Sequence, residues 1–504
     1  MRLVTAALVL LAGLLAAPPA SADPGGGAGA ADPGAAPRAS RAVPAGQWIL
    51  DPRGRVMVLH GVNMVFKRPP YAPDRVGFGR DDARFLARHG FRTVRLGLVW
   101  RAVEPRPGRY DDRYLARVAR TARILADEGI WTLLDFHQDL YHERFQGEGA
   151  PTWAVLDHGL PAQPQLGFPY NYFAMPGLNA AFDSFWRNAK GPGGVGLQQR
   201  YARAWAHTVL AFRGVPRLLG VDLLNEPWPG TGWELCVPLG CPAFDARLQR
   251  FSQRSIDAIR RVDRRTPVFY EPHVLFNNGV PTRVRPSGKR LGFSFHDYCL
   301  TAEVPIPVPG VPELACDVFD DLVWQNTARH VRRTGHTPLL TEFGATTDQH
   351  VLRDMVARAE DALTGWQYWA YCGCDDPTTT GPGATQALVH DPARPPRGRN
   401  VDRAKLRALV VPHPLAVAGT PRRSSCERGS RRFTLSWTTA RARGAGRFRA
   451  GSRTEISVPR LVYRRGYAAR VTGGRVVSAP GAPVLVVAQS AGAHRVRVSV
   501  RPLR

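Results

Sequence analysis

The feature that most limits the fold of this chain is a repeated alternation of short apolar segments with longer amphipathic ones. Eight apolar segments predict buried strands, at residues 58–63, 93–98, 131–137, 219–225, 267–271, 292–298, 338–342 and 365–371. Helical spacing of apolar residues occupies most of the gaps, at 81–89, 112–128, 198–212, 245–262, 320–334 and 349–363, but the link between the fifth and sixth strands has no clear helix. This alternation predicts an α/β fold, a (β/α)8 TIM barrel.

Beyond residue 411 the pattern changes to short β-rich segments separated by Gly, Pro and Ser. These segments are 432–437, 454–458, 482–488 and 494–500, and no long helical pattern accompanies them. They predict a small C-terminal all-β sandwich. We therefore assign residues 42–411 to the barrel and residues 412–504 to the sandwich.

The first residues predict export from the cell. Met1 and Arg2 are followed by an apolar run at 3–17 and by a small-residue cleavage site that ends at Ala22. The run is shorter than the roughly 20 residues of a membrane-spanning helix, so residues 1–22 are predicted to be a cleaved signal peptide. The Gly/Ala/Pro-rich stretch at 23–41 predicts a flexible leader. We expect a secreted, extracellular protein, in which disulfides can form.

Seven cysteines permit up to three disulfides and leave one thiol over. The pairs Cys236/Cys241 and Cys299/Cys316 would each close a short local loop, and we prefer them for that reason. Cys372 and Cys374 are too close in sequence to pair easily with each other, so one of them could reach Cys426. Because no cluster of Cys and His has the spacing of zinc ligands, we expect no metal site.

The net charge of +27 is concentrated unevenly along the chain. After residue 411, Glu427 and Glu455 are the only acidic residues among many arginines. Two interpretations stay open: a genome-wide bias toward Arg, or a basic face attracted to an anionic membrane surface or to acidic glycans. Nucleic acid fits the charge but not the export signal, and we do not expect it as a partner.

In a barrel of this kind the active site lies at the C-terminal ends of the strands. The polar and aromatic residues at these ends are Asn63, Lys67, Arg95, His137, Asp139, Asn225, Glu226, Glu271, His296, Tyr298, Glu342 and Trp369. Taken singly, His137, His296 and Trp369 would more often be core residues than ligands. Their occurrence together at strand ends indicates a site, in which Trp369 offers an aromatic face for a sugar ring.

Two carboxylates stand out in this set. Glu226 follows the apolar strand LLGVDLL within Asn-Glu-Pro, and Glu342 ends the strand PLLTEFG. Glycoside hydrolysis needs one carboxyl group to protonate the departing oxygen and another to attack the anomeric carbon or to activate water. The alternative is that each is a structural glutamate held by an ion pair, with Arg95 as a partner. Two such glutamates favour catalysis, with Glu226 as acid/base and Glu342 as nucleophile.

Neighbouring residues fit supporting roles. Asn225 can hydrogen-bond the 2-hydroxyl of a sugar, a contact that strengthens in the transition state. Arg95 and Tyr298 can hold Glu342 ionised by charge and hydrogen bonding. Because an acid/base must carry a proton, Glu226 is expected in a less polar setting, away from Arg95.

The motifs together resemble glycoside hydrolase family 5. The matching pieces are VRLGLVW with Arg95, DFHQD with His137, NEP with Asn225 and Glu226, HDY with His296 and Tyr298, TEFG with Glu342, and Trp369 on the eighth strand. The resemblance covers residues 49–371. It implies a barrel enzyme with two catalytic glutamates and no metal or organic cofactor.

Within that family the chain resembles the endoglycoceramidases, which release the intact glycan from glycosphingolipids. The features that carry this likeness are HGVNMVFKRPPY, DFHQDLY, the insertion WELCVPLGCPAFD after NEP, and the trailing β-domain. The resemblance implies that Lys67 and Asp139 bind the sugar next to ceramide. It does not separate these enzymes from endogalactosylceramidases, which share the layout.

The apolar, Pro-rich run at 302–314 agrees with a lipid substrate. It either lines a groove for lipid chains or packs on the barrel, and the segments 168–175 and 237–239 are candidates for the same wall. We therefore predict a monomeric, secreted, retaining endo-β-glycosidase that cleaves glycan from ceramide.

Two alternatives remain. One is a related β-glucanase or β-glucosidase that acts on polysaccharide or on another lipid glycoside. The other is a non-catalytic protein that binds glycolipid or membrane, against which the presence of both glutamates argues.

Overall fold

The computed structural model describes residues 41–237, 240–298, 311–379 and 385–503, with the side chains of 311–315 left out. The predicted signal peptide and nearly all of the predicted leader lie outside these ranges. Residues 39–504 belong to one compact unit. Among the described residues, no helix is both long enough and apolar enough to cross a bilayer.

Eight parallel strands close into a barrel, as the alternating pattern predicts. They are β4 (His60–Met64), β5 (Thr93–Val99), β6 (Trp131–His137), β7 (Leu218–Asp222), β8 (Val268–Tyr270), β9 (Leu291–Asp297), β10 (Thr337–Phe343) and β11 (Trp366–Tyr368). Every residue of these strands is buried, because helices cover the outer face and side chains fill the interior. The (β/α)8 prediction is confirmed.

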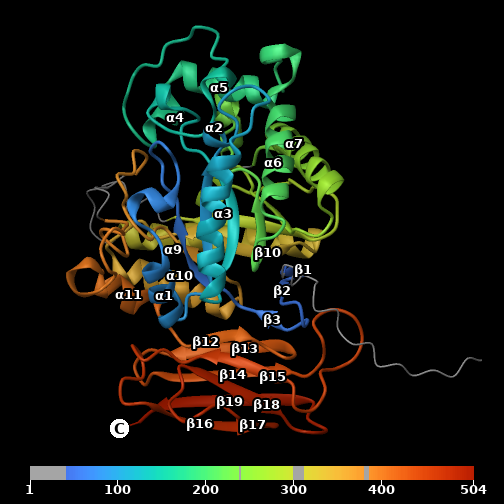
Figure 1. Cartoon of the computed structure of the whole chain (residues 1–504), viewed down its shortest axis with the longest axis vertical. Helices are drawn as coiled ribbons and strands as arrows, with labels where there is room; N and C mark the ends of the chain where they lie inside the picture. The colour runs from blue at the N-terminus through green and yellow to red at the C-terminus, as the bar shows by residue number, and fades with distance from the viewer. Residues whose placement is uncertain (1–40, 238–239, 299–310, 380–384, 504) are drawn as a thin grey trace, which may run out of the picture. The chain divides into compact units, whose positions relative to one another are not determined.

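The six predicted helices are present and surround the barrel (Figure 1). They are α1 (Arg80–Arg88), α3 (Asp112–Asp127), α6 (Leu197–Ala211), α7 (Pro242–Val262), α9 (Val311–Thr334) and α10 (Gln349–Asp361). Between β8 and β9 lies only a 3-10 turn, η6 (Val274–Asn278), where the sequence shows no helical pattern. The sequence did not predict α2 (Trp100–Val103), α4 (Tyr170–Ala174), α5 (Pro176–Trp186) and α11 (Arg403–Leu409).

A small antiparallel sheet precedes the barrel and was not predicted. Its strands are β1 (Val43–Ala45), β2 (Trp48–Leu50) and β3 (Val56–Met57). Val56 exchanges two backbone hydrogen bonds with Val417, at 3.0 and 2.7 Å. Arg41, which we assigned to the flexible leader, is instead fixed: its buried guanidinium donates to the carbonyls of Arg213 and Val215 at 2.8 and 2.7 Å.

The C-terminal region is a sandwich of two four-stranded sheets, and this prediction is also confirmed (Figure 1). One sheet has the order β12 (His413–Ala416), β15 (Arg453–Ser457), β18 (Val484–Gln489), β17 (Gly474–Val476); the other has β13 (Thr420–Glu427), β14 (Arg432–Thr438), β19 (Arg495–Pro502), β16 (Tyr467–Thr472). Alternate residues such as Phe433, Leu435 and Trp437 of β14 point into a shared core.

Three ionisable side chains are buried where the barrel meets the sandwich. His60 of β4 contacts Glu360 of α10 at 2.7 Å, and its ring stacks on His413 of β12 with centroids 3.6 Å apart. Burial lowers the pKa of His60 to about 3. Burial and the neighbouring His60 lower the pKa of His413 to about 3, and burial raises the pKa of Glu360 to about 7.

The cysteines follow the predictions only in part. Cys236 and Cys241 form the expected disulfide. Cys316 is disulfide-bonded, and its expected partner, Cys299, lies outside the described residues. Cys372 and Cys374 pair with each other, so our expectation of a link to Cys426 was wrong. The chain turns between the two residues and brings their Cα atoms to 5.2 Å, within the usual range for a disulfide. Cys426 is free.

Candidate active site

A cavity of about 210 Å³ opens at the C-terminal ends of the barrel strands. Seven of the ten residues predicted for the site line it: Lys67, His137, Asp139, Glu226, Tyr298, Glu342 and Trp369. The other three, Arg95, Asn225 and His296, are fully buried and contact residues of this set. The rule that strand ends gather the site therefore predicted residues that lie together.

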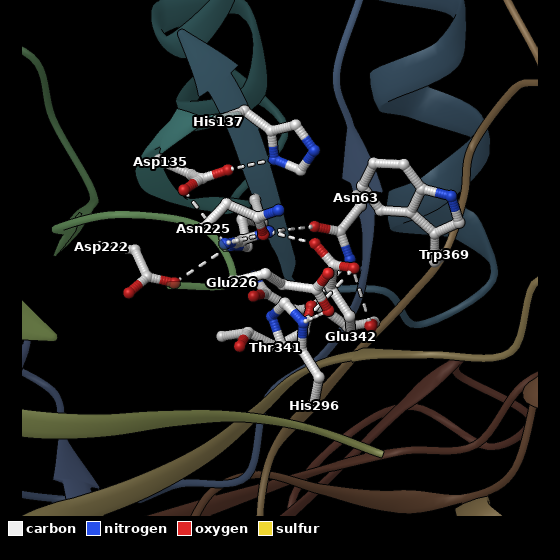
Figure 2. Close-up of polar contacts among 12 residues, drawn as sticks. Asn63, Asp135, His137, Asp222, Asn225, Glu226, His296, Thr341, Glu342 and Trp369 are labelled. Carbon is white, nitrogen blue, oxygen red and sulfur yellow. Dashed lines mark hydrogen bonds and ion pairs between the residues drawn. The ribbon is translucent and has the colours of Figure 1, made fainter. Parts of the chain in front are cut away.

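The two glutamates face one gap. A β-bulge between β9 and β10 brings Glu342 opposite His296. Glu226 follows β7 in a left-handed conformation with a φ of 45°, and its backbone N–H donates to Glu271 at 2.8 Å. Such a conformation costs about 1–3 kcal/mol and indicates that its surroundings fix this residue. One carboxylate oxygen from each glutamate lies within 4.8 Å of the other and of a His296 ring nitrogen (Figure 2).

Glu342 is held by cationic and hydroxyl groups. Its Oε1 accepts a short hydrogen bond from Arg95, and its Oε2 accepts one from the Tyr298 hydroxyl at 2.9 Å. The expected contacts are therefore present. Burial nevertheless raises the pKa of Glu342, and the opposing charges of His296 and Arg95 leave it above its usual 4.5. Burial thus outweighs the groups that we expected to keep this carboxyl ionised.

The carboxyl group of Glu226 has different neighbours from that of Glu342. Its Oε1 accepts a hydrogen bond from Asn277 at 2.7 Å and lies 2.8 Å from Nδ1 of His296. Among the described residues, its carboxyl group has no contact with Arg95, as expected. The setting is not the less polar one that we expected, because the amide of Asn277 and the charged ring of His296 both contact the carboxyl group. Asn277 lies on η6, where no motif marked it, and sequence reasoning missed it.

His296 connects the two glutamates. Burial alone would lower its pKa, but the charges of Glu271 and Glu342 and the hydrogen bond to Glu226 raise it well above 6.5. His296 is therefore a charged donor that contacts both carboxyl groups, at 2.8 Å for Glu226 and 3.6 Å for Glu342.

Arg95 is the centre of a buried ionic network under the cavity. Its guanidinium contacts four carboxylates, those of Asp135, Asp222, Glu271 and Glu342. Removing a charge from such a network leaves others uncompensated, at a cost of about 3–5 kcal/mol. Asp135 and Asp222 were not predicted, although each stands within a quoted motif. An acidic residue in an otherwise apolar strand requires a buried partner, and that was the available signal.

Asn225 is tied to the same network. Its Oδ1 accepts from Arg95 at 3.0 Å, and its Nδ2 donates to the carbonyl of Gln138 at 3.1 Å. An amide nitrogen carries two hydrogens, so one donor remains for a ligand. These two hydrogen bonds fix the orientation of the amide without using all of its hydrogen-bonding capacity.

A second charged cluster lies at the other side of the cavity. Nζ of Lys67 donates to Asp139 at 2.6 Å and to Thr378 at 2.7 Å, and lies 3.1 Å from Asp376. It also lies 4.6 Å from the ring centroid of Trp369. Lys67 and Asp139 are thus held together, while Thr378 and Asp376 were missed because they follow the last strand outside every motif.

His137 belongs to this cluster and is charged. Its Nδ1 faces Asp135 at 2.7 Å (Figure 2), and its Nε2 faces Asp139 at 3.4 Å. Burial lowers its pKa, but the charges of both aspartates more than offset this and raise the pKa to about 10. Its ring also stacks on Trp369 with centroids 5.2 Å apart.

The cavity also has an apolar wall. It is formed by Phe168, Tyr172, Phe173, Trp228 and Leu275, with the Tyr172 and Trp228 rings 4.9 Å apart. The segment 168–175 thus lines the cavity as predicted. Of 237–239, Val237 is exposed outside it and the rest is not described; the side chains of 302–314 also lie outside the described residues.

Among the described residues, three clusters of acidic and histidine side chains have the spacing of metal ligands, but their chemistry does not suit a cation. They are Glu226/His296/Glu342, His137/Asp139/Glu148 and Asp135/Asp222/Glu271. Each cluster already contains a charged histidine or contacts Arg95 or Lys67. These fixed positive charges oppose a metal ion at the same place.

Comparisons with known proteins agree with this architecture. Residues 58–374 match the family model Cellulase (glycosyl hydrolase family 5), and residues 412–500 match the glycoside hydrolase family 5 C-terminal domain. The chain is 35% identical to endoglycoceramidase I of Rhodococcus hoagii over 466 residues, which cover 90% of this chain and 87% of that protein.

Solved structures give the same result. Endo-glycoceramidase II from Rhodococcus sp., in a five-membered iminocyclitol complex, is 31% identical with a TM-score of 0.75, covering 91% of this chain and 100% of that chain. The ganglioside GM3 complex of the same enzyme is 29% identical with a TM-score of 0.74, covering 91% and 99%. The chain is therefore a glycoside hydrolase and belongs to glycoside hydrolase family 5.

Proposed function

We propose that this protein is a retaining endo-β-glycosidase that hydrolyses the bond between glycan and ceramide in glycosphingolipids. The observation that carries the proposal is the division of the cavity: a charged side with Lys67 and Asp139, an apolar wall with Phe173 and Trp228, and two glutamates in the same cavity. A glycan fits the charged side and a lipid fits the apolar wall. The relatives named endoglycoceramidase and the GM3 complex support this substrate class.

The spacing of the glutamates supports retention of configuration. Retaining enzymes hold their carboxyl groups about 5–5.5 Å apart, whereas inverting enzymes leave roughly 6.5–9.5 Å for a water molecule. Oxygens of Glu226 and Glu342 lie within 4.8 Å of each other. That proximity supports a retaining site rather than an inverting one.

The reaction then proceeds in two displacements. Glu342 attacks the anomeric carbon while Glu226 gives its proton to the departing ceramide oxygen, so that a glycosyl ester forms on Glu342 and ceramide leaves as an alcohol. Glu226 next takes a proton from water, whose oxygen attacks the same carbon and releases the glycan. Glu342 returns as a carboxylate and Glu226 returns protonated.

The surrounding residues prepare these steps. Arg95 and Tyr298 orient Glu342 toward the anomeric carbon, and His296 donates to Glu226. We assign the remaining N–H of Asn225 to the sugar 2-hydroxyl. Trp369 supplies an aromatic face to the sugar.

Secretion by cleavage after Ala22 and a monomeric state remain part of the proposal. So does attraction of the basic C-terminal domain to anionic membranes, which its few acidic residues support. Sedimentation with anionic vesicles tests that attraction, and binding that is equal to vesicles of neutral lipid would overturn it.

Product analysis on three substrates tests the function: a glucosyl-linked ganglioside, galactosylceramide and a soluble β-glucan, each with wild type and Glu342→Gln. We expect ceramide and an intact glycan from a glycolipid, and no product with the variant. Sugar released only from the β-glucan would replace the lipid substrate with polysaccharide, and no product from any substrate would contradict an enzymatic role.

A further inference from the structure

A groove of about 1240 Å³ lies between the barrel and the C-terminal domain. Its barrel side is formed by α1 and the residues after it, by segment 395–398 and by α11. Its other side is formed by segments 457–461 and 483–484 of the sandwich. It shares no lining residue with the active-site cavity, so the glycosidase reaction does not account for it.

The groove is strongly basic. Its lining contains six arginines, Arg84, Arg88, Arg92, Arg397, Arg403 and Arg460, against two carboxylates, Asp81 and Glu128. Both carboxylates contact the same arginine, Arg84, at 3.9 and 3.3 Å. Within the described part of the chain, the other five arginines have no ion pair, although the charge of Glu455 acts on Arg92. The groove therefore keeps an excess of positive charge.

The positive charge of Arg92 is unfavourable for the folded protein in the absence of a bound anion. Its side chain is partly buried, and its guanidinium has only a long hydrogen bond to the carbonyl of Glu128, at 3.5 Å. Burial and the charge of Arg217 lower its pKa. A half-buried cation beside other cations gains stability from any anion that enters the groove.

The shape and the side chains limit what that anion is. The groove is concave and its lining includes Pro396, Pro459 and Pro483, a shape that suits a narrow chain better than a flat bilayer. No Trp or Tyr lines it, and of its aromatic side chains Phe85 is buried and His89 is partly buried. Planar guanidinium groups pair in bidentate fashion with phosphate and sulfate oxygens. The volume exceeds that of one such group.

We propose that this groove binds an extended, soluble polyanion whose charges are phosphate or sulfate groups. Such a ligand contacts Arg88 of the barrel, Arg403 of α11 and Arg460 of the sandwich at once. Because these residues come from both domains, the bound ligand connects them and stabilises the folded chain by linkage.

Calorimetric titration of the full-length protein with a short linear polyphosphate, at physiological salt, tests the proposal. The groove variant combines Arg88→Gln, Arg403→Gln and Arg460→Gln. The control variant combines Arg470→Gln, Arg475→Gln and Arg497→Gln, which remove the same charge from exposed positions of the sandwich outside the groove. We expect the groove variant to bind at least about tenfold more weakly than wild type and the control variant to bind within about threefold of it.

Two further readouts complete the test. Polyphosphate is expected to raise the melting temperature of wild type and of the control variant, and to raise that of the groove variant less. Equal loss of affinity in both variants, or no binding by wild type, would overturn the site. Groove-dependent binding to phosphatidylglycerol vesicles without binding to polyphosphate would overturn the soluble ligand in favour of a lipid headgroup.

Discussion

The two ends of the barrel treat buried charge in opposite ways. At the mouth, Arg95 contacts four carboxylates and His296 lies between two glutamates, so both cations stay charged and are paired. At the junction with the sandwich, His60, Glu360 and His413 lie together, and burial shifts the pKa of each toward its neutral form. An ionisable group that is paired with an opposite charge can stay charged and act on a substrate. A buried group in its neutral form contributes only to packing. The mouth should therefore govern rate, and the junction should govern stability.

The largest effect is expected at the nucleophile. Glu342→Gln keeps the volume and the hydrogen bond to Tyr298 but cannot attack the anomeric carbon, so we expect kcat/KM to fall by more than about 10⁴-fold. Steady-state kinetics on a glycolipid measures this loss, with the melting temperature as a control for folding. A residual activity of a tenth of wild type in a folded variant would contradict the assigned role.

The acid/base should show a loss that depends on the leaving group. Glu226→Gln cannot donate a proton, so we expect a loss of roughly 10²–10⁴-fold on ceramide, whose alcohol is a poor leaving group. An aryl glycoside with an acidic phenol needs no proton, and its first step should be affected far less. Similar losses on both substrates would show that Glu226 does not act as the acid.

The pH dependence of kcat/KM tests how the partners of Glu342 affect its ionisation. Glu342 must be ionised to attack, and its pKa lies above 4.5, so kcat/KM should fall about tenfold per pH unit below a midpoint higher than 4.5. Tyr298→Phe removes a hydrogen bond that favours the ionised form, and we expect the acid limb to move to higher pH. A limb that stays in place, or moves to lower pH, would mean that Tyr298 does not stabilise the carboxylate.

At the junction, Glu360→Gln should change stability and leave kcat unchanged. The pKa of Glu360 is raised to about 7 in the fold from 4.5, so the stability that its protonated form contributes is present below pH 4.5 and lost as pH rises through 7. The Gln side chain cannot ionise, so the variant does not lose stability in this way. The free energy of unfolding of the variant minus that of wild type should therefore increase by about 1–3 kcal/mol between pH 4.5 and pH 7. Denaturant unfolding at several pH values measures the difference; a constant difference would exclude titration of Glu360.

The sequence predicted the barrel well because strands that are buried on both faces consist of continuous apolar runs. It predicted the site because polar residues that close such runs must meet at one edge. It missed four strands of the sandwich, β12, β13, β16 and β17, and the three short strands that precede the barrel. The residues of β13, TPRRSSCE, show no alternation. Those elements are specified by their neighbours rather than by their own composition.

The missed site residues have a common cause. Asn277, Asp376 and Thr378 lie in connections, where neither periodicity nor a motif marks a residue, and only the folded chain brings them to Glu226 and Lys67. The disulfide between Cys372 and Cys374 was missed for the same reason, since a local turn rather than sequence separation decides whether the two can meet.

The backbone pairing of Val56 with Val417 has a consequence for how the protein is made. Synthesis proceeds from the N-terminus, so β3 leaves the ribosome long before its partner residue exists. The floor of the barrel, including His60, stays without its cover until the last domain has been translated. The barrel therefore gains this backbone pairing, and the cover over His60, only after the C-terminal domain has been synthesised.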